Sequence, residues 1–220
     1  MTMTVQNEWP SVNRIFCIGR NFQNHAQELN NTVPEEPVVF MKPASAWVDL
    51  RAPLLIPKAF GEVHHELELA LLFGNPISRT NESLKDEEIE SAIVGVSIGL
   101  DLTRRGLQSI LKSKGLPWEA AKAFDGSCPI GPWLNYPFKT FKNLTFSLFV
   151  NTQHRQQGIA KDMIFTVTEQ VRSIVSWCDI KKGDVLMTGT PAGVGALMDG
   201  DKIVASLDDK LKIETWVKRL

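Results

Sequence analysis

The sequence predicts a β-rich α+β fold in which strands predominate and a few short helices lie between them. Short apolar runs that end at glycine, proline or aspartate recur along the chain, whereas helical spacing of apolar residues is confined to a few segments. Strands and helices do not alternate regularly, which argues against a doubly wound sheet. The 220 residues, 43% hydrophobic and 22% charged, suit one globular domain. We therefore expect a single domain over residues 1–220, with residues 1–12 as an N-terminal extension.

The first half of the chain is expected to hold most of the strands. Each is an apolar run bounded by glycine, proline or a polar cluster, and the runs are Arg14–Gly19, Val38–Met41, Leu54–Ile56, Val63–Phe73 and Ile93–Leu102. Prolines on both sides of Leu54–Ile56 place that strand at a sheet edge. A helix is expected from about Asn21 to Leu29, and another between Thr103, as its N-cap, and Gly115. The polar stretch Ser78–Glu90 is expected to be a connection.

The second half combines a hairpin, a helix and three further strands. Phe146–Val150 and His154–Gly158 are expected to pair around a turn at Asn151-Thr152. Apolar residues then recur at helical spacing, which predicts a helix from about Thr166 to Cys178. The remaining strands are expected at Val185–Thr188, Lys202–Leu207 and Leu211–Val217.

Composition excludes several classes of partner and compartment. A net charge of −1 gives no basic surface for nucleic acid and no attraction to acidic lipid. No apolar run is long enough to span a bilayer, and the first ten residues carry no secretory signal. The cysteines, Cys17, Cys128 and Cys178, lack the spacing of a zinc or redox motif. We interpret them as buried free thiols in a reducing compartment and expect a cytoplasmic protein that binds neither nucleic acid nor membranes.

Two glutamates occupy one face of the most regular strand. If Val63–Phe73 is extended, His64, Glu66 and Glu68 share a face, and leucines occupy the other. Burying two neighbouring carboxylates is costly unless a cation or hydrogen-bond donors compensate. The alternative is an exposed edge strand on which both glutamates are solvated, and the segment alone does not decide between the two.

Asp101 follows a strand whose polar face is built of small residues. Gly95, Ser97 and Gly99 share its face of Ile93–Leu102, which leaves space beside the carboxylate. Asp101 could instead simply cap the helix that follows. Three carboxylates on neighbouring strands suit a hard divalent cation, Mg²⁺ or Mn²⁺, better than zinc, which favours histidine or cysteine.

Taken in order, these segments resemble the fumarylacetoacetate hydrolase family. The matching pieces are Gly19-Arg20-Asn21-Phe22 with His25 and Glu28, Phe40-Met41-Lys42-Pro43, His65-Glu66-Leu67-Glu68-Leu69, Asp101-Leu102-Thr103 with Arg105, Lys122-Ala123-Phe124-Asp125, Met163-Ile164-Phe165, Gly183-Asp184-Val185, and Thr188-Gly189-Thr190-Pro191-Ala192-Gly193-Val194-Gly195. The chain is most similar to the short, single-domain branch with acylpyruvases and oxaloacetate decarboxylases. The resemblance implies a mixed β-roll fold of the family's C-terminal-domain type, and usually a homodimer.

The resemblance also implies roles for individual residues. Glu66, Glu68 and Asp101 would ligate Mg²⁺ or Mn²⁺, and Lys122 would stabilise a developing oxyanion or hold a second substrate carboxylate. His25 and Glu28 lie three residues apart on the predicted helix, so that Glu28 can orient His25 as a general base. That helix could act as a lid. The expected substrate contacts are Arg20, Lys42, Arg105, Gln108 and Thr190.

For several of these residues a purely structural interpretation remains open. A lone lysine is most often a surface residue, a His–Glu pair often lies on an exposed helix face, and the glycine-rich Thr188–Gly195 segment could be only a tight turn.

Three functions are compatible with these residues. The first, which we expect, is metal-dependent cleavage of a C–C bond in a small 2-oxo acid, by acylpyruvate hydrolysis or oxaloacetate decarboxylation. The second is an isomerase, such as an oxaloacetate keto–enol tautomerase or a 2-hydroxymuconate-type isomerase, with the same metal and the same His–Glu pair. The third is a binding protein without activity, which would have no need of a general base. The sequence does not separate the first two.

Overall fold

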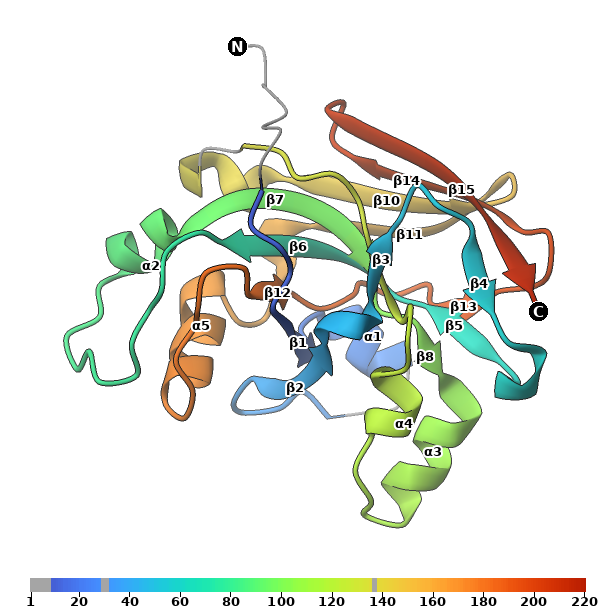
Figure 1. Ribbon diagram of the computed structural model, residues 1–220, viewed down its shortest axis with the longest axis horizontal. Helices are drawn as coiled ribbons and strands as arrows, with labels where there is room; N and C mark the ends of the chain where they lie inside the picture. The colour runs from blue at the N-terminus through green and yellow to red at the C-terminus, as the bar shows by residue number, and fades with distance from the viewer. Residues whose placement is uncertain (1–8, 29–31, 136–137) are drawn as a thin grey trace.

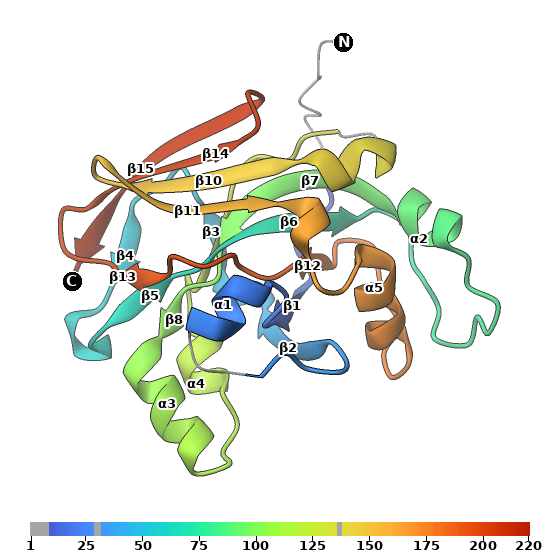
Figure 2. The same cartoon turned by 180° about the vertical axis from the view of Figure 1, so that it is seen from behind.

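The computed structural model describes residues 9–28, 32–135 and 138–220 (Figure 1). Within these residues the strands form three sheets, and the helices are short and lie at the periphery (Figures 1 and 2). This is the β-rich α+β fold that the sequence predicts. Most of the expected N-terminal extension, residues 1–8, lies outside the described residues.

The largest sheet has seven strands and mixed directions. In spatial order its strands are β2 (Val38–Pro43), β1 (Arg14–Gly19), β12 (Val185–Met187), β6 (Leu67–Phe73), β7 (Ile93–Leu100), β9 (Cys128–Ile130) and β3 (Trp47–Asp49). β1 and β12 run parallel, as do β3 and β9, and the other neighbours are antiparallel. All seven residues of β6 are buried, which explains why this strand is an almost continuous apolar run.

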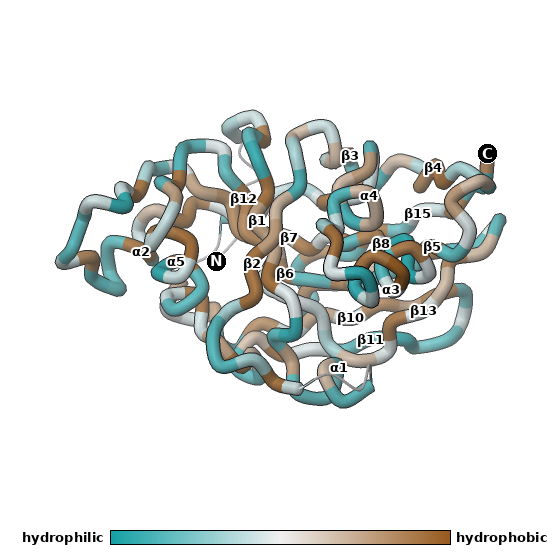
Figure 3. The backbone as a smooth tube through the Cα atoms, turned by 90° about the horizontal axis from the view of Figure 1, so that it is seen from below, coloured by the Kyte–Doolittle hydropathy of each residue, from teal (hydrophilic) through white to brown (hydrophobic). Residues whose placement is uncertain are grey.

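A second sheet packs across the first, and a third joins the two. The five-stranded sheet is ordered β11 (Gln153–Ile159), β10 (Thr145–Val150), β14 (Lys202–Leu207), β15 (Leu211–Arg219) and β4 (Leu54–Ile56). Its strands β10 and β14 lie over β6 and β7, so that apolar side chains between the layers form the core. The three-stranded sheet is ordered β13 (Gly195–Ala196), β5 (Val63–His65) and β8 (Thr103–Arg104). Figure 3 shows the apolar character of the central strands and the polar loops around α2.

Five α-helices are found in the described part of the chain. They are α1 (Gln23–Glu28), α2 (Asp86–Ala92), α3 (Arg105–Ser113), α4 (Glu119–Lys122) and α5 (Val167–Val175). Thr166 begins α5 with a capping box, because its hydroxyl accepts from the Glu169 amide while the Glu169 carboxylate accepts from the Thr166 amide. No helix in the described ranges is long and apolar enough to cross a membrane.

Most expected elements are confirmed. The hairpin turns at Asn151, whose φ of +57° is in the left-handed region, and β4 lies at a sheet edge as its prolines predict. The end of the first expected helix, Leu29, lies outside the described residues.

Three predictions were wrong in detail. Thr103 is not an N-cap, because it pairs with His64 in the three-stranded sheet and α3 begins only at Arg105. The polar stretch Ser78–Glu90 is not only a connection, since it contains most of α2. The strand expected over Val63–Phe73 is interrupted at Glu66.

The interruption at Glu66 has a physical cause that also explains the end of β7. The chain enters the large sheet after Glu66, where β5 gives way to β6, and leaves that sheet after Leu100, where β7 gives way to β8. Strands β5 and β8 pair with each other in the three-stranded sheet. At this crossing the Asp101 amide donates to the Glu66 carbonyl oxygen at 2.8 Å. The junction of the two sheets therefore holds Glu66 and Asp101 side by side.

Candidate active site

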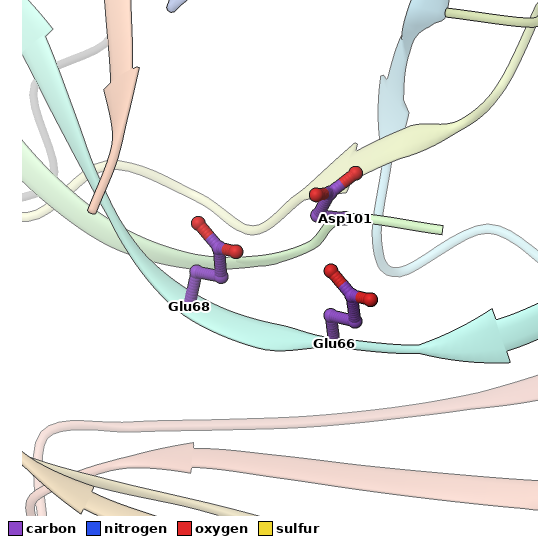
Figure 4. A group of neighbouring side chains, drawn as sticks. All are labelled: Glu66, Glu68 and Asp101. Atoms are coloured by element: carbon purple, nitrogen blue, oxygen red, sulfur yellow. The ribbon is translucent and has the colours of Figure 1, made fainter. Parts of the chain in front are cut away.

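Three buried carboxylates meet at the junction of the two sheets. Glu66, Glu68 and Asp101 are 5%, 2% and 1% exposed, and one oxygen of each lies within 4.8 Å of the others. In Figure 4 both glutamates project from the same side of their strand towards Asp101. Although the strand is interrupted at Glu66, the two glutamates still lie on one face, as the alternation predicts. The alternative of a solvated edge strand is wrong, because all three side chains are buried.

Two of the carboxylates are paired with cations from the helical side of the site. Lys122, at the end of α4, contacts Glu66 at 2.7 Å and Asp101 at 2.5 Å, and Arg105 at the start of α3 forms an ion pair with Glu66. Burial opposes the charged form of Glu66, but Lys122 and Arg105 outweigh it and hold the pKa of Glu66 well below its usual range. Asp101 and Glu66 likewise raise the pKa of Lys122 against the effect of its burial. Lys122 is 4% exposed and is not a surface lysine.

Glu68 differs from its neighbours because no side-chain cation pairs with it among the described residues. Its carboxylate accepts a hydrogen bond from the backbone amide of Gly189 at 2.8 Å. Burial, Asp101 and Glu66 together raise the pKa of Glu68 well above its usual range. A buried carboxylate whose charge is uncompensated, with two further carboxylates beside it, is the environment that a bound cation relieves. The residues present therefore fit Mg²⁺ or Mn²⁺, both of which take oxygen ligands.

Lys42 lies behind this triad. Its side chain has no exposed area, and its ammonium contacts Asp101 at 2.7 Å. The same ammonium donates to the carbonyl oxygen and hydroxyl of Ser127, each at 3.0 Å, and to the Lys122 carbonyl. Lys42 is not among the residues that line the cavity in front of the triad. Its contacts suit an internal counter-ion that fixes Asp101 better than the substrate contact that the sequence predicts.

The expected His–Glu pair forms on α1, and its histidine lines the cavity in front of the triad. The Nδ1 atom of His25 lies 3.2 Å from Glu28, and the histidine is 5% exposed. Glu28 also accepts from the backbone amide of Gly193, at 3.1 and 3.3 Å to its two oxygens. His25 is therefore buried, whereas Glu28 is exposed. With Nδ1 directed at Glu28, Nε2 of His25 is the ring atom left for a substrate.

The segment before α1 is anchored to the turn that follows β12. Asn21 is fully buried, donates to the Thr188 carbonyl oxygen at 2.8 Å and accepts from the Phe165 amide at 2.7 Å. Gly189 has a φ of +99°, and a Cβ atom there would lie 2.6 Å from the Cβ atom of Asn21. Glycine is therefore required at this position for the turn to approach Asn21 and to direct its amide at Glu68.

A small cavity of about 40 Å³ lies between the triad and the helices. Its polar lining includes every expected site residue except Glu28 and Lys42, and the further residues that line it are Ile18, Gly19, Val38, Phe40, Lys112 and Trp118. Within α3, Arg105 donates to the Gln108 side chain at 2.8 Å. Arg20 has a φ of +59°, a conformation that costs a non-glycine residue energy and is common at functional sites.

Thr190 lies at the wall of this cavity and is held by a buried glutamine. Its hydroxyl donates to the Leu67 carbonyl oxygen at 2.8 Å and accepts from the Gln156 side chain at 2.7 Å. The oxygen of Gln156 accepts from the Leu67 amide at 3.0 Å and lies 2.8 Å from Nδ1 of His65. The turn that carries Thr190 is thus tied to the strands of the triad.

Sequence reasoning missed Lys112, Trp118 and Gln156. Lys112 could have been found, because it follows Arg105 by seven residues and Gln108 by four, and so lies on the same helix face. Gln156 had no signal, since only the packing of β11 against the triad strands makes it internal. Of the histidines beside the glutamates, His65 is buried, and His64 lies 3.8 Å from Glu62. The roles of the individual site residues stay predictions.

Comparisons with known proteins agree with this geometry. The family model described as fumarylacetoacetate (FAA) hydrolase C-terminal matches residues 14–218. Oxaloacetate tautomerase YcgM of Escherichia coli (strain K12) is 44% identical over 201 residues, which are 90% of this chain and 89% of that protein. The mitochondrial oxaloacetate decarboxylase of Dictyostelium discoideum is 33% identical over 219 residues, 96% of this chain and 97% of that protein.

A solved structure matches over the whole chain. The fumarylpyruvate hydrolase of Pseudomonas aeruginosa, in complex with Mn²⁺ and pyruvate, gives a TM-score of 0.88 at 33% identity. The match covers 100% of this chain and 95% of that one. The fold expected from the resemblance is therefore confirmed.

Proposed function

Because this chain belongs to the fumarylacetoacetate hydrolase family, we propose that it is a metal-dependent enzyme that interconverts the keto and enol forms of oxaloacetate. The proposal follows the isomerase alternative rather than the C–C cleavage that the sequence first suggested, because the 44% identical relative is an oxaloacetate tautomerase. The observation that carries it is that one base, His25, lines the same cavity as the carboxylate triad and Lys122.

The residues of the cavity account for the chemical steps. A divalent cation held by Glu66, Glu68 and Asp101 would polarise the 2-oxo group and so acidify the neighbouring C3–H bond. His25 removes the C3 proton through Nε2, and Glu28 keeps the ring in the required tautomer and orientation. The electron pair of the C–H bond moves to the 2-oxo oxygen, near the ammonium of Lys122, which stabilises the developing negative charge. The protonated His25 then returns this proton to the same oxygen, directly or through a water molecule, which gives the enol and restores the base, and no bond between heavy atoms breaks.

The test follows the enol and pyruvate in the same sample. Metal-stripped protein, with and without added Mg²⁺ or Mn²⁺, is mixed with enol oxaloacetate while enol absorbance and pyruvate are recorded against a metal-only blank. We expect metal-dependent loss of enol without pyruvate, and a loss of rate of about 10²-fold or more in His25→Asn. Replacement of the exposed His154 by Asn is the matched control. Enol loss at the rate of the blank would contradict the proposal.

Cleavage of a C–C bond is the second candidate, favoured by the His25–Glu28 pair, which could also activate water for attack on an acylpyruvate. The solved fumarylpyruvate hydrolase supports it. In the same assay it requires pyruvate to appear above the blank, from oxaloacetate or from acetylpyruvate. His25→Asn then separates the two forms of cleavage, because decarboxylation needs no activated water and hydrolysis does.

We also propose that the protein is a homodimer, as the family resemblance implies. Light scattering after size-exclusion chromatography tests this, and a mass of one chain at micromolar concentration would contradict it.

A further inference from the structure

We propose that Lys112, with Arg20 beside it, forms a subsite for a second carboxylate at the distal end of the substrate. The enzyme would then select 2-oxo dicarboxylates over 2-oxo acids with a neutral distal group. This inference rests on the proposed function, since it names the substrate class of the same cavity.

The first argument is the distribution of charge around the cavity. Lys122 and Arg105 are both paired with carboxylates of the triad. Among the residues that the structure describes, neither Arg20 nor Lys112 forms an ion pair, although both line the cavity. Two cations that line the cavity and pair with none of its carboxylates provide a site for a ligand that brings an anionic group.

The second argument is the position of Lys112 on α3. It lies two turns beyond Arg105 on the same helix face, about 10 Å along the axis. Helical side chains lean towards the N-terminus, so the lysine reaches back from there over the cavity. Arg105 itself contacts Glu66. A substrate held at the triad by its 2-oxo acid end therefore extends towards Lys112 with its other end.

The third argument is the cost of holding Lys112 in place. Its side chain is half-buried, with the ammonium 5.0 Å from the centre of the Trp118 ring. Burial, followed by repulsion from Arg20, Arg105 and Lys122, lowers its pKa. An unrestrained lysine side chain would point into solvent, where its charge is hydrated. The contact with the Trp118 ring instead keeps the Lys112 ammonium beside the cavity. An anionic ligand would remove the repulsion.

The test uses two ligands that cannot enolise and that differ by the distal carboxylate. L-malate and L-lactate are titrated calorimetrically into Mg²⁺-loaded wild-type protein, Lys112→Met, Lys112→Arg and Lys114→Met. Lys114 is exposed and lies outside the cavity, and so it is the matched control. We expect wild-type protein to bind malate at least tenfold more tightly than lactate, Lys112→Met to lose this preference with lactate affinity unchanged, and Lys112→Arg to restore it.

Each other outcome counts against the subsite. Equal affinities in the wild type, undetectable malate binding, or a preference that survives in Lys112→Met would overturn it. An equal loss for both ligands would show that Lys112 only supports the fold. If the preference depends on Lys112 but no tautomerase activity is found, the subsite stands and the proposed function fails. If Lys112→Met has tautomerase activity with an unchanged KM for oxaloacetate, the proposed function stands and the subsite is refuted.

Discussion

Replacing Glu68 by glutamine is expected to stabilise the metal-free protein and to weaken its stabilisation by metal. Glu68 is buried and accepts one backbone hydrogen bond, but no side-chain cation pairs with it in the described chain. Glutamine has nearly the same shape as glutamate, and its side-chain oxygen can still accept the hydrogen bond from the Gly189 amide. Because glutamine is neutral, it avoids the free-energy cost of burying a charge or of protonating the carboxylate. The two effects have opposite signs, which distinguishes a metal ligand from an ordinary buried residue.

The magnitudes can be estimated separately. Relief of an uncompensated buried polar group is worth about 1–3 kcal/mol, and each kcal/mol shifts Tm by about 2–4 °C in a protein of this size. We therefore expect the metal-free variant to melt about 2–12 °C higher than the metal-free wild type. Metal at one hundred times its Kd contributes about 2.7 kcal/mol to the wild type, or about 5–11 °C. If the variant binds one hundredfold more weakly, the same concentration contributes about 0.4 kcal/mol, roughly 1–2 °C.

The assay is thermal unfolding of chelator-treated protein over a series of Mg²⁺ and Mn²⁺ concentrations. Glu82→Gln, at an exposed position, is the control and should behave like the wild type in both conditions. A Glu68→Gln protein that melts lower than the wild type without metal, yet keeps the full metal-induced rise, would refute the assignment of Glu68 as a ligand.

Three further measurements test other parts of the structure. Burial lowers the pKa of His65 to about 4. The unfolded chain therefore takes up a proton on this histidine at a higher pH than the folded protein does. The contribution of His65 to the free energy of unfolding is complete above about pH 6.5 and falls by about 3 kcal/mol towards pH 4. His65→Gln should remove that part of the pH dependence in denaturant titrations, and parallel curves would contradict it. Thr166→Ala should cost about 1 kcal/mol through loss of the capping box, whereas Thr166→Ser should cost little; equal losses would exclude a capping role. The sequence predicts three buried thiols, but Cys178 is only partly buried. Iodoacetamide at pH 8 should therefore label Cys178 in the folded protein, because burial raises the pKa of the other two thiols, to about 12 for Cys128 and well above the usual range for Cys17. Early labelling of either buried cysteine, detected by mass spectrometry, would show that the core opens.

The sequence predicted those parts of the site that depend on local periodicity. Alternation along Val63–Phe73 placed Glu66 and Glu68 on one face, and three-residue spacing on a helix brought His25 to Glu28. These relations are set by the backbone of one element, so a single segment suffices to infer them.

What the sequence could not predict depends on contacts between distant segments. The segment that contains Lys42 predicts a substrate contact. The internal position of this lysine follows instead from the packing of β2 against the loop that carries Ser127. Thr103 has the chemistry of an N-cap, yet pairing with β5 draws it into a strand. No local pattern indicates that β5 and β8 leave the large sheet together, and this departure brings Asp101 next to Glu66.

The hydrogen bonds of Gln156 give the wall of the cavity a fixed polarity. The side-chain oxygen of Gln156 accepts a hydrogen bond from the Leu67 amide, so its side-chain nitrogen is the group that donates to Thr190. The Thr190 hydroxyl accepts this bond and donates its own proton to the Leu67 carbonyl oxygen. Thr190 therefore presents only a lone pair to a bound molecule. A carboxylate at this wall would be repelled by that oxygen and would need a backbone N–H instead, whereas a hydroxyl group, such as that of an enol, would find an acceptor already oriented.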